Sequence, residues 1–478
     1  MRDAAVPGEQ GMTGPILLAR GADERSYRLA ALLVRPSGVR PPPLTPQEGG
    51  EVEPTVLHER FGRTVWRYDF ELPAHRDAGY RLGDAVYPVA ADLTGDARVA
   101  FVSCNGQESG DHSRALEERN VMWRRLADEH DRAPFGLLLQ GGDQVYADEV
   151  LDAHPALRHW WRHRNSRKGG ESYPAEAREA AERFYFERYL TLYAQPGIAR
   201  LCARVPSLMM WDDHDIVDGW GSHPEPTLDS PVGRGLFAAA REAFAVFQLG
   251  LTPSERDAAD TFGYAATFPG FTVVAPDLRS ERRPHRVMGP AGWAAFERDL
   301  EAGAADDRLL VMSSVPALGP RLSLVERLMT VFPGIRKYKD DLRDQWQSRS
   351  HREEWKRFLL ALERKRLGHR RGVTVVSGEI HLATRGEMPI GDGAVLHQLV
   401  ASGIAHPAPP AAYATGLGLL ATLGEDPLPD RPIRLRPLPG RRWIYTAERN
   451  YLVLERASGA WSAVWELETG GRTPALPI

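Results

Sequence analysis

The sequence predicts an α/β protein with one large domain that follows a small N-terminal β domain. The chain has 478 residues, which is long for one simple domain and enough to bury a large core. Residues 1–95 contain short runs of alternating apolar and polar residues, separated by segments rich in glycine and proline. From residue 96 to 478, strand-like runs alternate with longer amphipathic runs, a pattern typical of a layered α/β domain.

The N-terminal domain is expected to be a small β-sandwich of the immunoglobulin or fibronectin kind. Four runs have the length and alternation of strands: PILLAR, YRLAALLVR, TVLHER and TVWRYDFEL. The segment SGVRPPPLTPQEGGEVEP separates the second from the third, and its prolines and glycines are typical of a loop.

In the large domain, three helices and two intervening strands are expected before a proline-rich segment that follows residue 405. The last two strand-like runs, RNYLVLER and AWSAVWELE, lie in residues 448–468 and are expected to complete a sheet of this domain. The helices are expected at 114–130, 176–202 and about 340–367, and the intervening strands at 272–280 and 308–316.

Composition favours a soluble protein without a bulk charge that would attract nucleic acid. Charged residues make up 26% of the chain, and the formal net charge is −4. The opening MRDAAVPGEQGMTG lacks a basic start followed by an apolar run, and no later segment reaches the length of a membrane span. We therefore expect a cytoplasmic protein with no membrane partner. The two cysteines are too few for a disulfide scaffold of this size.

Four segments run an apolar strand into a polar cluster: VAFVSCNG (99–106), LLLQGGDQVYADE (137–149), PSLMMWDDHD (206–215) and VTVVSGEIHLA (373–383). Ligands of open α/β sheets gather beyond the carboxyl ends of the strands, so these clusters can meet although they are far apart in sequence. The sequence therefore predicts one metal site assembled from all four.

The segment GGDQVYADE offers two ligands of different chemistry. The glycines allow a sharp turn, after which Asp143 and Tyr146, three residues apart, can face one point. An aspartate can bridge two cations, and a phenolate is a hard anionic ligand. The alternative is an aspartate that caps a helix, with a core tyrosine behind it.

WDDHD places three acids and a histidine at the end of a buried strand, which is costly unless a cation compensates the charge. Asp212 and Asp213 are expected as metal ligands, and His214 as the group that stabilises a phosphate oxygen or protonates the leaving group. A solvated loop is the alternative.

Taken alone, the remaining two clusters are weaker evidence for a metal site. Glu379 and His381 share a face if their strand stays extended, although such a pair is often structural. Cys104 would be a thiolate ligand, or else a small buried thiol. His397 and His406 are expected to be packing or surface residues, and the basic aromatic run 158–168 a solvated insertion.

Taken together, FVSCNG, GDQVYAD, RVPSLMMWDDHD and SGEIHLA, with VVAPDLRSER and MGPAGWAAFERDL between them, resemble the PhoD-like phosphatase branch of the calcineurin-like metallophosphoesterases. The resemblance covers about residues 97–400. It implies a four-layer α/β/β/α metallophosphoesterase domain whose cofactors are Fe³⁺ and Ca²⁺, or another divalent cation such as Mn²⁺ or Zn²⁺, in place of Ca²⁺.

The resemblance also assigns the ligands. Cys104, Asp143, Tyr146 and His381 match the iron ligands, while Asp143, Asp213 and the acid at position 379 match those of the second cation. Glu379 stands where the family usually has aspartate, and Asp215 where it usually has glutamate. Each change moves a carboxylate by about one methylene, which affects the identity of the second metal and the substrate preference.

The implied activity is hydrolysis of a small-molecule phosphate ester by a metal-activated water, with monoester and diester both open. His214, Asp215 and Arg279 are the expected catalytic residues, the arginine as a clamp on the phosphate oxygens. A catalytically silent member that binds metal or a phosphorylated ligand is the alternative. The oligomeric state stays open.

Overall fold

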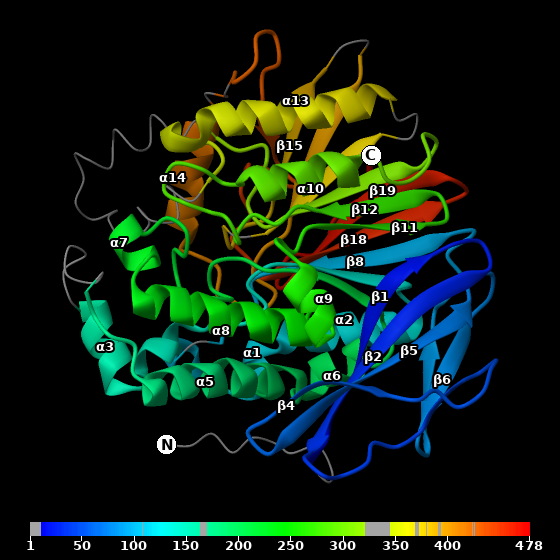
Figure 1. Ribbon diagram of the computed structural model, residues 1–478. Helices are drawn as coiled ribbons and strands as arrows, with labels where there is room; N and C mark the ends of the chain where they lie inside the picture. Colours follow the sequence, from blue (N-terminus) through cyan, green and yellow to red (C-terminus); the bar gives the residue numbers. More distant parts are fainter. Residues whose placement is uncertain are drawn as a thin grey trace.

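The computed structural model describes residues 11–107, 109–162, 170–320, 345–368, 372–378, 380–390, 393–422, 424 and 426–478. Within these ranges the strands form two large sheets and a small one, and helices lie on the outer sides of the large sheets (Figure 1). No helix in this part of the chain is both long and apolar enough to cross a membrane.

The first sheet joins strands from both ends of the chain to the strands that lead into three of the four polar clusters. Its path is β20-β19-β18-β8-β9-β10-β1-β2-β5-β4, and β21 pairs with β19. The strands are β1 (Thr13–Ala22), β2 (Ser26–Pro36), β4 (Thr55–Arg60), β5 (Arg63–Pro73), β8 (Ala97–Val102), β9 (Leu137–Gly141), β10 (Ser207–Met210), β18 (Asn450–Ala457), β19 (Ala460–Leu467), β20 (Gly471–Arg472) and β21 (Leu476–Pro477).

The second sheet carries the strand of the fourth cluster. It follows the order β11-β12-β13-β14-β16-β15-β17, and the small third sheet follows β3-β6-β7. These strands are β11 (Tyr264–Phe268), β12 (Phe271–Ala275), β13 (Arg308–Ser313), β14 (Val373–Ser377), β15 (Thr384–Pro389), β16 (Val395–Val400), β17 (Arg434–Arg436), β3 (Leu44–Pro46), β6 (Ala78–Leu82) and β7 (Ala85–Val89).

Some of the helices begin at a residue whose side chain caps the first turn. In α8, for example, Ser230 accepts a hydrogen bond from Gly233 N at 2.9 Å, and Pro231 occupies the first turn. The described helices are α1 (Leu116–Arg119), α2 (Val121–Arg132), α3 (Pro155–Arg162), α5 (Ala175–Tyr193), α6 (Pro196–Cys202), α7 (Glu225–Leu228), α8 (Pro231–Phe247), α9 (Pro253–Ala258), α10 (Pro290–Leu300), α13 (Arg352–Gly368) and α14 (Ala411–Ala421), with 3₁₀ turns η2 (Ser109–Ser113), η3 (Asp148–Asp152) and η5 (Arg349–His351).

Alternate side chains of one strand enter different cores. In β9, Leu138 packs with α2, α5 and α8, whereas Leu137 and Leu139 pack against residues of the second sheet. In β13, Leu310 belongs to this inter-sheet core, while Leu309 packs with α10 and α13. Because both faces of these strands are covered, their sequences are almost continuously apolar.

The N-terminal strands expected from the sequence are present, and they are joined to the rest by main-chain pairing. β1 pairs in parallel with β10, so β1, β2, β5 and β4 extend the first sheet. The small third sheet packs against them through Phe70 and Tyr80, whose ring centroids are 5.4 Å apart. Tyr80 in turn donates a hydrogen bond to Ala203 O at 2.7 Å. The domain boundary at residue 95 stays a prediction.

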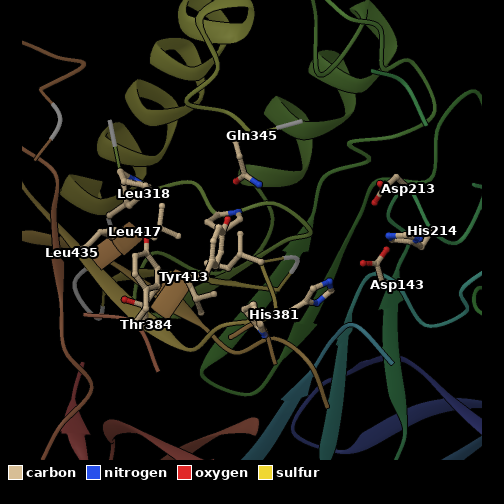
Figure 2. A pocket seen from close by; sticks show the side chains of 17 residues that line it. Asp143, Asp213, His214, Leu318, Gln345, His381, Thr384, Tyr413, Leu417 and Leu435 are labelled. Carbon is tan, nitrogen blue, oxygen red and sulfur yellow. The ribbon is translucent and has the colours of Figure 1, made fainter. Parts of the chain in front are cut away.

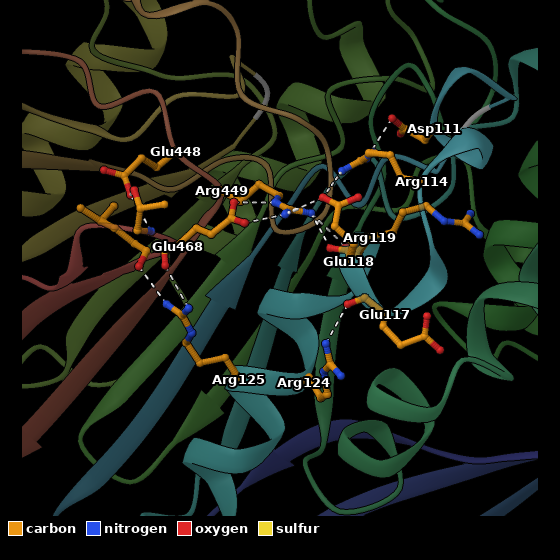
Figure 3. A network of polar contacts seen from close by, with 12 residues as sticks. Asp111, Arg114, Glu117, Glu118, Arg119, Arg124, Arg125, Glu448, Arg449 and Glu468 are labelled. Atoms are coloured by element: carbon orange, nitrogen blue, oxygen red, sulfur yellow. Dashed lines mark hydrogen bonds and ion pairs between the residues drawn. The ribbon is translucent and has the colours of Figure 1, made fainter.

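The C-terminal strands extend the same sheet, because β18 pairs antiparallel with β8. An arginine at the start of this segment links it to the chain that follows β8 (Figure 3). Arg449 donates to both carboxylate oxygens of Glu468 at 2.6 and 2.7 Å and to Glu118 at 3.0 Å, and only 6% of its side chain is exposed. The network therefore holds α1 against the C-terminal strands.

Candidate metal centre

Three polar clusters start at the same edge of the first sheet. β8, β9 and β10 are parallel neighbours, with Val102 opposite Gln140 and Met210 opposite Gly141. The loops that leave these strands therefore begin side by side. The fourth cluster follows β14 of the second sheet, and its His381 lines the same cavity as Asp143 and Asp213.

A tight turn at Gly142 sets the direction of the loop after β9. Its φ is +100°, and a Cβ there would lie 2.9 Å from Asp212 Cβ, so only glycine fits. Two hydrogen bonds tie this loop to the loop after β8: Cys104 N donates to Gly142 O at 3.1 Å, and Asn105 N to Asp143 O at 2.8 Å.

Three of the ligands expected from the sequence have strained backbone. Cys104, Asp143 and His381 have φ of 52°, 56° and 51°, in the left-handed region that residues other than glycine rarely occupy. Such conformations cost about 1–3 kcal/mol each and persist at functional sites because the surrounding structure enforces them.

Asp143 lies at the centre of the site. Its Oδ2 is 3.5 Å from Cys104 Sγ and 3.4 Å from the Tyr146 hydroxyl. With Asp213 and His214 it forms a group whose ligand atoms all lie within 4.8 Å of one another. Gly219 N fixes Asp213 by donating to its Oδ2 at 2.8 Å. The expected ligands Cys104, Asp143, Tyr146 and Asp213 therefore do meet.

His214 is held by a carboxylate that was not selected from the sequence. Its Nδ1 lies 2.8 Å from Asp148 Oδ2, and Asp148 also accepts a hydrogen bond from Asp218 N. The imidazole stacks on Tyr146 with ring centroids 4.2 Å apart. Asp148 belongs to the GDQVYADE segment, but nothing local to that segment indicates that it faces His214.

A second histidine joins His381. The rings of His381 and His406 stack with centroids 3.6 Å apart, and His406 also stacks on Tyr146 at 5.5 Å. His406 N donates to Cys104 O at 3.2 Å. His406 therefore packs, which is one of the two expected alternatives, and it contacts three of the expected ligands.

The carboxylate of Asp215, which was expected to be catalytic, is taken up by hydrogen bonds. Its carboxylate accepts hydrogen bonds from the backbone N–H groups of Asp143, Val145 and Asp212 and from Gln248 Nε2, at 2.8–3.2 Å. Burial raises the pKa of Asp215 to about 7, and the backbone hydrogen bonds oppose that rise. Asp215 therefore joins the loop after β9 to the loop after β10, and its catalytic role stays a prediction.

Asp212, an expected metal ligand, and Arg279, an expected phosphate clamp, form a buried ion pair. The guanidinium of Arg279 is completely buried, pairs through Nε with Asp212 Oδ1, and lies 3.6 Å from Asp213 Oδ1. Its Nη1 donates to Trp220 O at 3.0 Å. The positive charge of Arg279 thus partly neutralises the negative charges of Asp212 and Asp213. Glu379 lies outside the described residues.

Comparisons with known proteins agree with this geometry. The family model described as PhoD related phosphatase matches residues 89–338, just over half of the chain. The chain belongs to the PhoD-related phosphatase family. It is also similar to the uncharacterized protein YGR266W of Saccharomyces cerevisiae, at 24% identity over 86% of this chain and 75% of that protein.

A solved structure shares the fold of this PhoD-related chain. The structure titled "Structure of PhoD" superposes with a TM-score of 0.57 at 13% identity, over 97% of this chain and 88% of that one. At this identity the likeness concerns the fold alone, so the chemistry has to be argued from the residues of this chain.

The electrostatics of the PhoD-related site fit a bound cation. Burial and the carboxylate of Asp213 raise the pKa of Asp143 well above its usual value, which expresses the cost of packing acids together without a counter-ion. Within the described residues, Asp143 Oδ1 and His381 Nδ1 are buried and make no hydrogen bond. Burial lowers the pKa of His381 well below its usual value, and a neutral imidazole is the form that binds a metal.

Proposed function

We propose that this protein is a metal-dependent hydrolase of small-molecule phosphate esters. The observation that carries the proposal is the position of Asp143. Its Oδ2 faces the Cys104 thiol and the Tyr146 hydroxyl, and its Oδ1 is buried without a hydrogen bond. One carboxylate oxygen of Asp143 also lies within 4.8 Å of ligand atoms of Asp213 and His214. Membership of the PhoD-related phosphatase family supports the same activity.

In this proposal Cys104, Asp143, Tyr146 and His381 hold Fe³⁺, and Asp143 and Asp213 hold a divalent cation such as Ca²⁺, Mn²⁺ or Zn²⁺. Thiolate, phenolate and imidazole suit a transition metal, and carboxylate oxygens suit a harder divalent ion. When bound, the cations supply Lewis-acid stabilisation of the phosphoryl oxygens and activation of the attacking water.

The protein's own contribution centres on His214. Burial alone would lower the pKa of His214, but the carboxylates of Asp148 and Asp213 outweigh it and raise the pKa well above its usual value. In the proposal the imidazole carries a proton, and an ionised Asp148 accepts the hydrogen bond from Nδ1. Nε2, which lies 3.9 Å from Asp218 Oδ1, is the nitrogen that we propose stabilises a phosphate oxygen or gives a proton to the leaving alcohol.

We further propose that the two large sheets and their flanking helices form the four-layer α/β/β/α arrangement of metallophosphoesterases. The separation of the apolar residues into a core between the sheets and cores under the helices supports this. The proposal also keeps a cytoplasmic location and leaves the oligomeric state open.

The test is turnover by protein of known metal content. Purified protein, checked by elemental analysis, is assayed with chromogenic phosphate monoesters and diesters across pH 6–10, with and without a chelator. The proposal expects hydrolysis that the chelator abolishes and that added metal restores. Comparison of the two ester classes then decides between monoesterase and diesterase.

A catalytically silent, metal-binding protein is the second reading. The buried cluster alone would satisfy it, because a ligand site needs no turnover. Fully metallated protein that hydrolyses neither ester class nor a panel of natural esters would favour this reading over the proposed hydrolase.

A further inference from the structure

One cavity continues from the candidate metal centre into an apolar part of the fold (Figure 2). Asp143, Asp213 and His214 line one end of it, and His381 lies between this end and the remainder. The other end is lined by apolar and aromatic side chains, among them Leu318, Ile380, Tyr413, Leu417, Leu435 and Tyr445.

The side chains at the apolar end are packed against one another and buried. Leu417 of α14 packs with Leu435 of β17 and with Tyr445 in one cluster, and at most 9% of each of these side chains is exposed. The helix itself, AAYATGLGLLA, contains no charged residue. Its next leucine, Leu419, points away and is 63% exposed.

Among the described residues, the charged groups of this cavity lie at one end. Among the described lining residues, the acids and histidines are the four at the metal centre, and no lysine or arginine is present. Thr384, in the apolar part, already donates its hydroxyl hydrogen to Ile444 O at 2.7 Å. A second phosphate would therefore lose its hydration here without a charged partner, which is unfavourable.

The size of the cavity limits what it can hold. The space open to water-sized groups is about 110 Å³. This volume also includes the end at the metal centre, where the phosphate would lie, so the apolar end suits a small group. We take an aryl group or an alkyl chain of about eight carbons as the size to test.

We propose that the substrate is a phosphate ester of a small apolar alcohol, aryl or medium-chain alkyl, whose apolar group lies in this cavity while its phosphate meets the metal centre. The inference rests on the proposed hydrolase function and adds the class of alcohol. It makes α14 a specificity-determining element, with Leu417 as its main contact.

The test compares esters that differ in the alcohol alone. Ethyl, n-butyl, n-octyl and n-hexadecyl esters have leaving alcohols of nearly equal acidity, so chemistry stays constant while apolar area grows. We expect kcat/KM to rise roughly fourfold for each added methylene that is fully buried, and to level off near n-octyl. The 2-(2-ethoxyethoxy)ethyl ester, equal in length to n-octyl but polar, should resemble the ethyl ester.

Two leucines of the same helix provide a matched pair. Leu417→Gln should lower the octyl-to-ethyl ratio of kcat/KM by at least tenfold, and the exposed Leu419→Gln should leave it unchanged. If Leu417→Gln does not fold, Leu417→Ala enlarges the cavity and should shift the plateau to chains two or three carbons longer.

The outcomes separate this inference from the function on which it rests. Hydrolysis of all the esters at one rate, or a continued rise to n-hexadecyl, would refute the apolar cavity and leave the hydrolase intact. If no ester is hydrolysed, the hydrolase proposal fails. Calorimetric binding of octylphosphonate and ethylphosphonate to metal-loaded protein then tests the cavity alone, with equal affinities counting against it.

Discussion

His214 Nδ1 lies 2.8 Å from Asp148 Oδ2, and no more than about a fifth of either side chain is exposed. The two residues are 66 positions apart, so the pair exists because η3 and the loop after β10 meet at the edge of the first sheet. Burial alone would raise the pKa of Asp148, but His214 more than offsets it and lowers that pKa. The carboxylate thus stays ionised and fixes the imidazole.

Asp148→Asn should lower kcat at least tenfold with metal content unchanged, because an amide cannot fix the proton on Nδ1 as the carboxylate does. His214→Ala should lower kcat by roughly 10²-fold, and adding Asp148→Asn to that variant should change little, since the two side chains act as a unit. Steady-state kinetics with elemental analysis measure both effects. Asp152→Asn, in the same η3 turn but exposed, is the control.

Loss of metal from His214→Ala would show that His214 is a ligand. Additive losses in the double variant would show that Asp148 does not act through the imidazole.

Asp143→Asn should remove metal and lower activity by orders of magnitude while the fold stays intact. Asparagine keeps the shape of the side chain and tolerates the left-handed φ of 56°, so the backbone is not the cause of the loss. Elemental analysis measures the metal content, an assay measures the activity, and Tm shows whether the fold is intact. The matched control is Asp430→Asn, an exposed aspartate with φ of 60°, which should retain metal and activity. Normal activity of Asp143→Asn would sink the proposed metal centre.

The loops that bear Cys104, Asp143 and Asp213 could be predicted because each follows an apolar strand directly, and parallel strands bring such loops to one edge. The pairing of β1 with β10 could not, since no local pattern in either strand specifies a partner almost 190 residues away. The same limit applies to His406, which reaches His381 and Tyr146 only through the tertiary fold.

The separate roles of similar side chains also could not be predicted from the sequence. Asp212, Asp213 and Asp215 stand side by side in WDDHD, yet one faces Arg279, one faces the cavity, and one accepts backbone hydrogen bonds. Their roles depend on which N–H groups and cations surround each carboxylate, and the loop conformation sets that. A motif can therefore locate a site without showing the role of each of its residues.

Acid should destabilise the protein through His130 of α2. Burial and the positive charge of Arg204 lower the pKa of His130 to about 4, while its side chain accepts a hydrogen bond from Phe135 N at 3.1 Å. The unfolded chain, with a pKa near 6.5, therefore binds more protons. The stabilising contribution is complete above pH 6.5 and is lost as the pH falls toward 4, by about 2 kcal/mol at pH 5.

Urea unfolding at pH 7.5 and pH 5 measures this loss. His130→Asn keeps an acceptor for Phe135 N but does not titrate, so the variant should lose about 2 kcal/mol less than the native protein between the two pH values. An equal loss in both proteins would show that His130 does not carry the acid sensitivity.

The proposed iron site predicts a coloured protein. A phenolate bound to Fe³⁺ gives a charge-transfer band in the visible, so protein purified aerobically with iron should be coloured, and dithionite should bleach it. Tyr146→Phe keeps the ring that stacks on His214 and removes the oxygen, so it should abolish or strongly shift the band while iron content is measured in parallel. Cys104→Ser should alter the spectrum as well, because oxygen replaces a softer sulfur donor.

Tyr185→Phe is the control, since that buried hydroxyl donates to Ile216 O and should not affect the colour. Iron-loaded protein without a visible band, or a band untouched by Tyr146→Phe, would mean that Tyr146 packs beside the site without binding its metal.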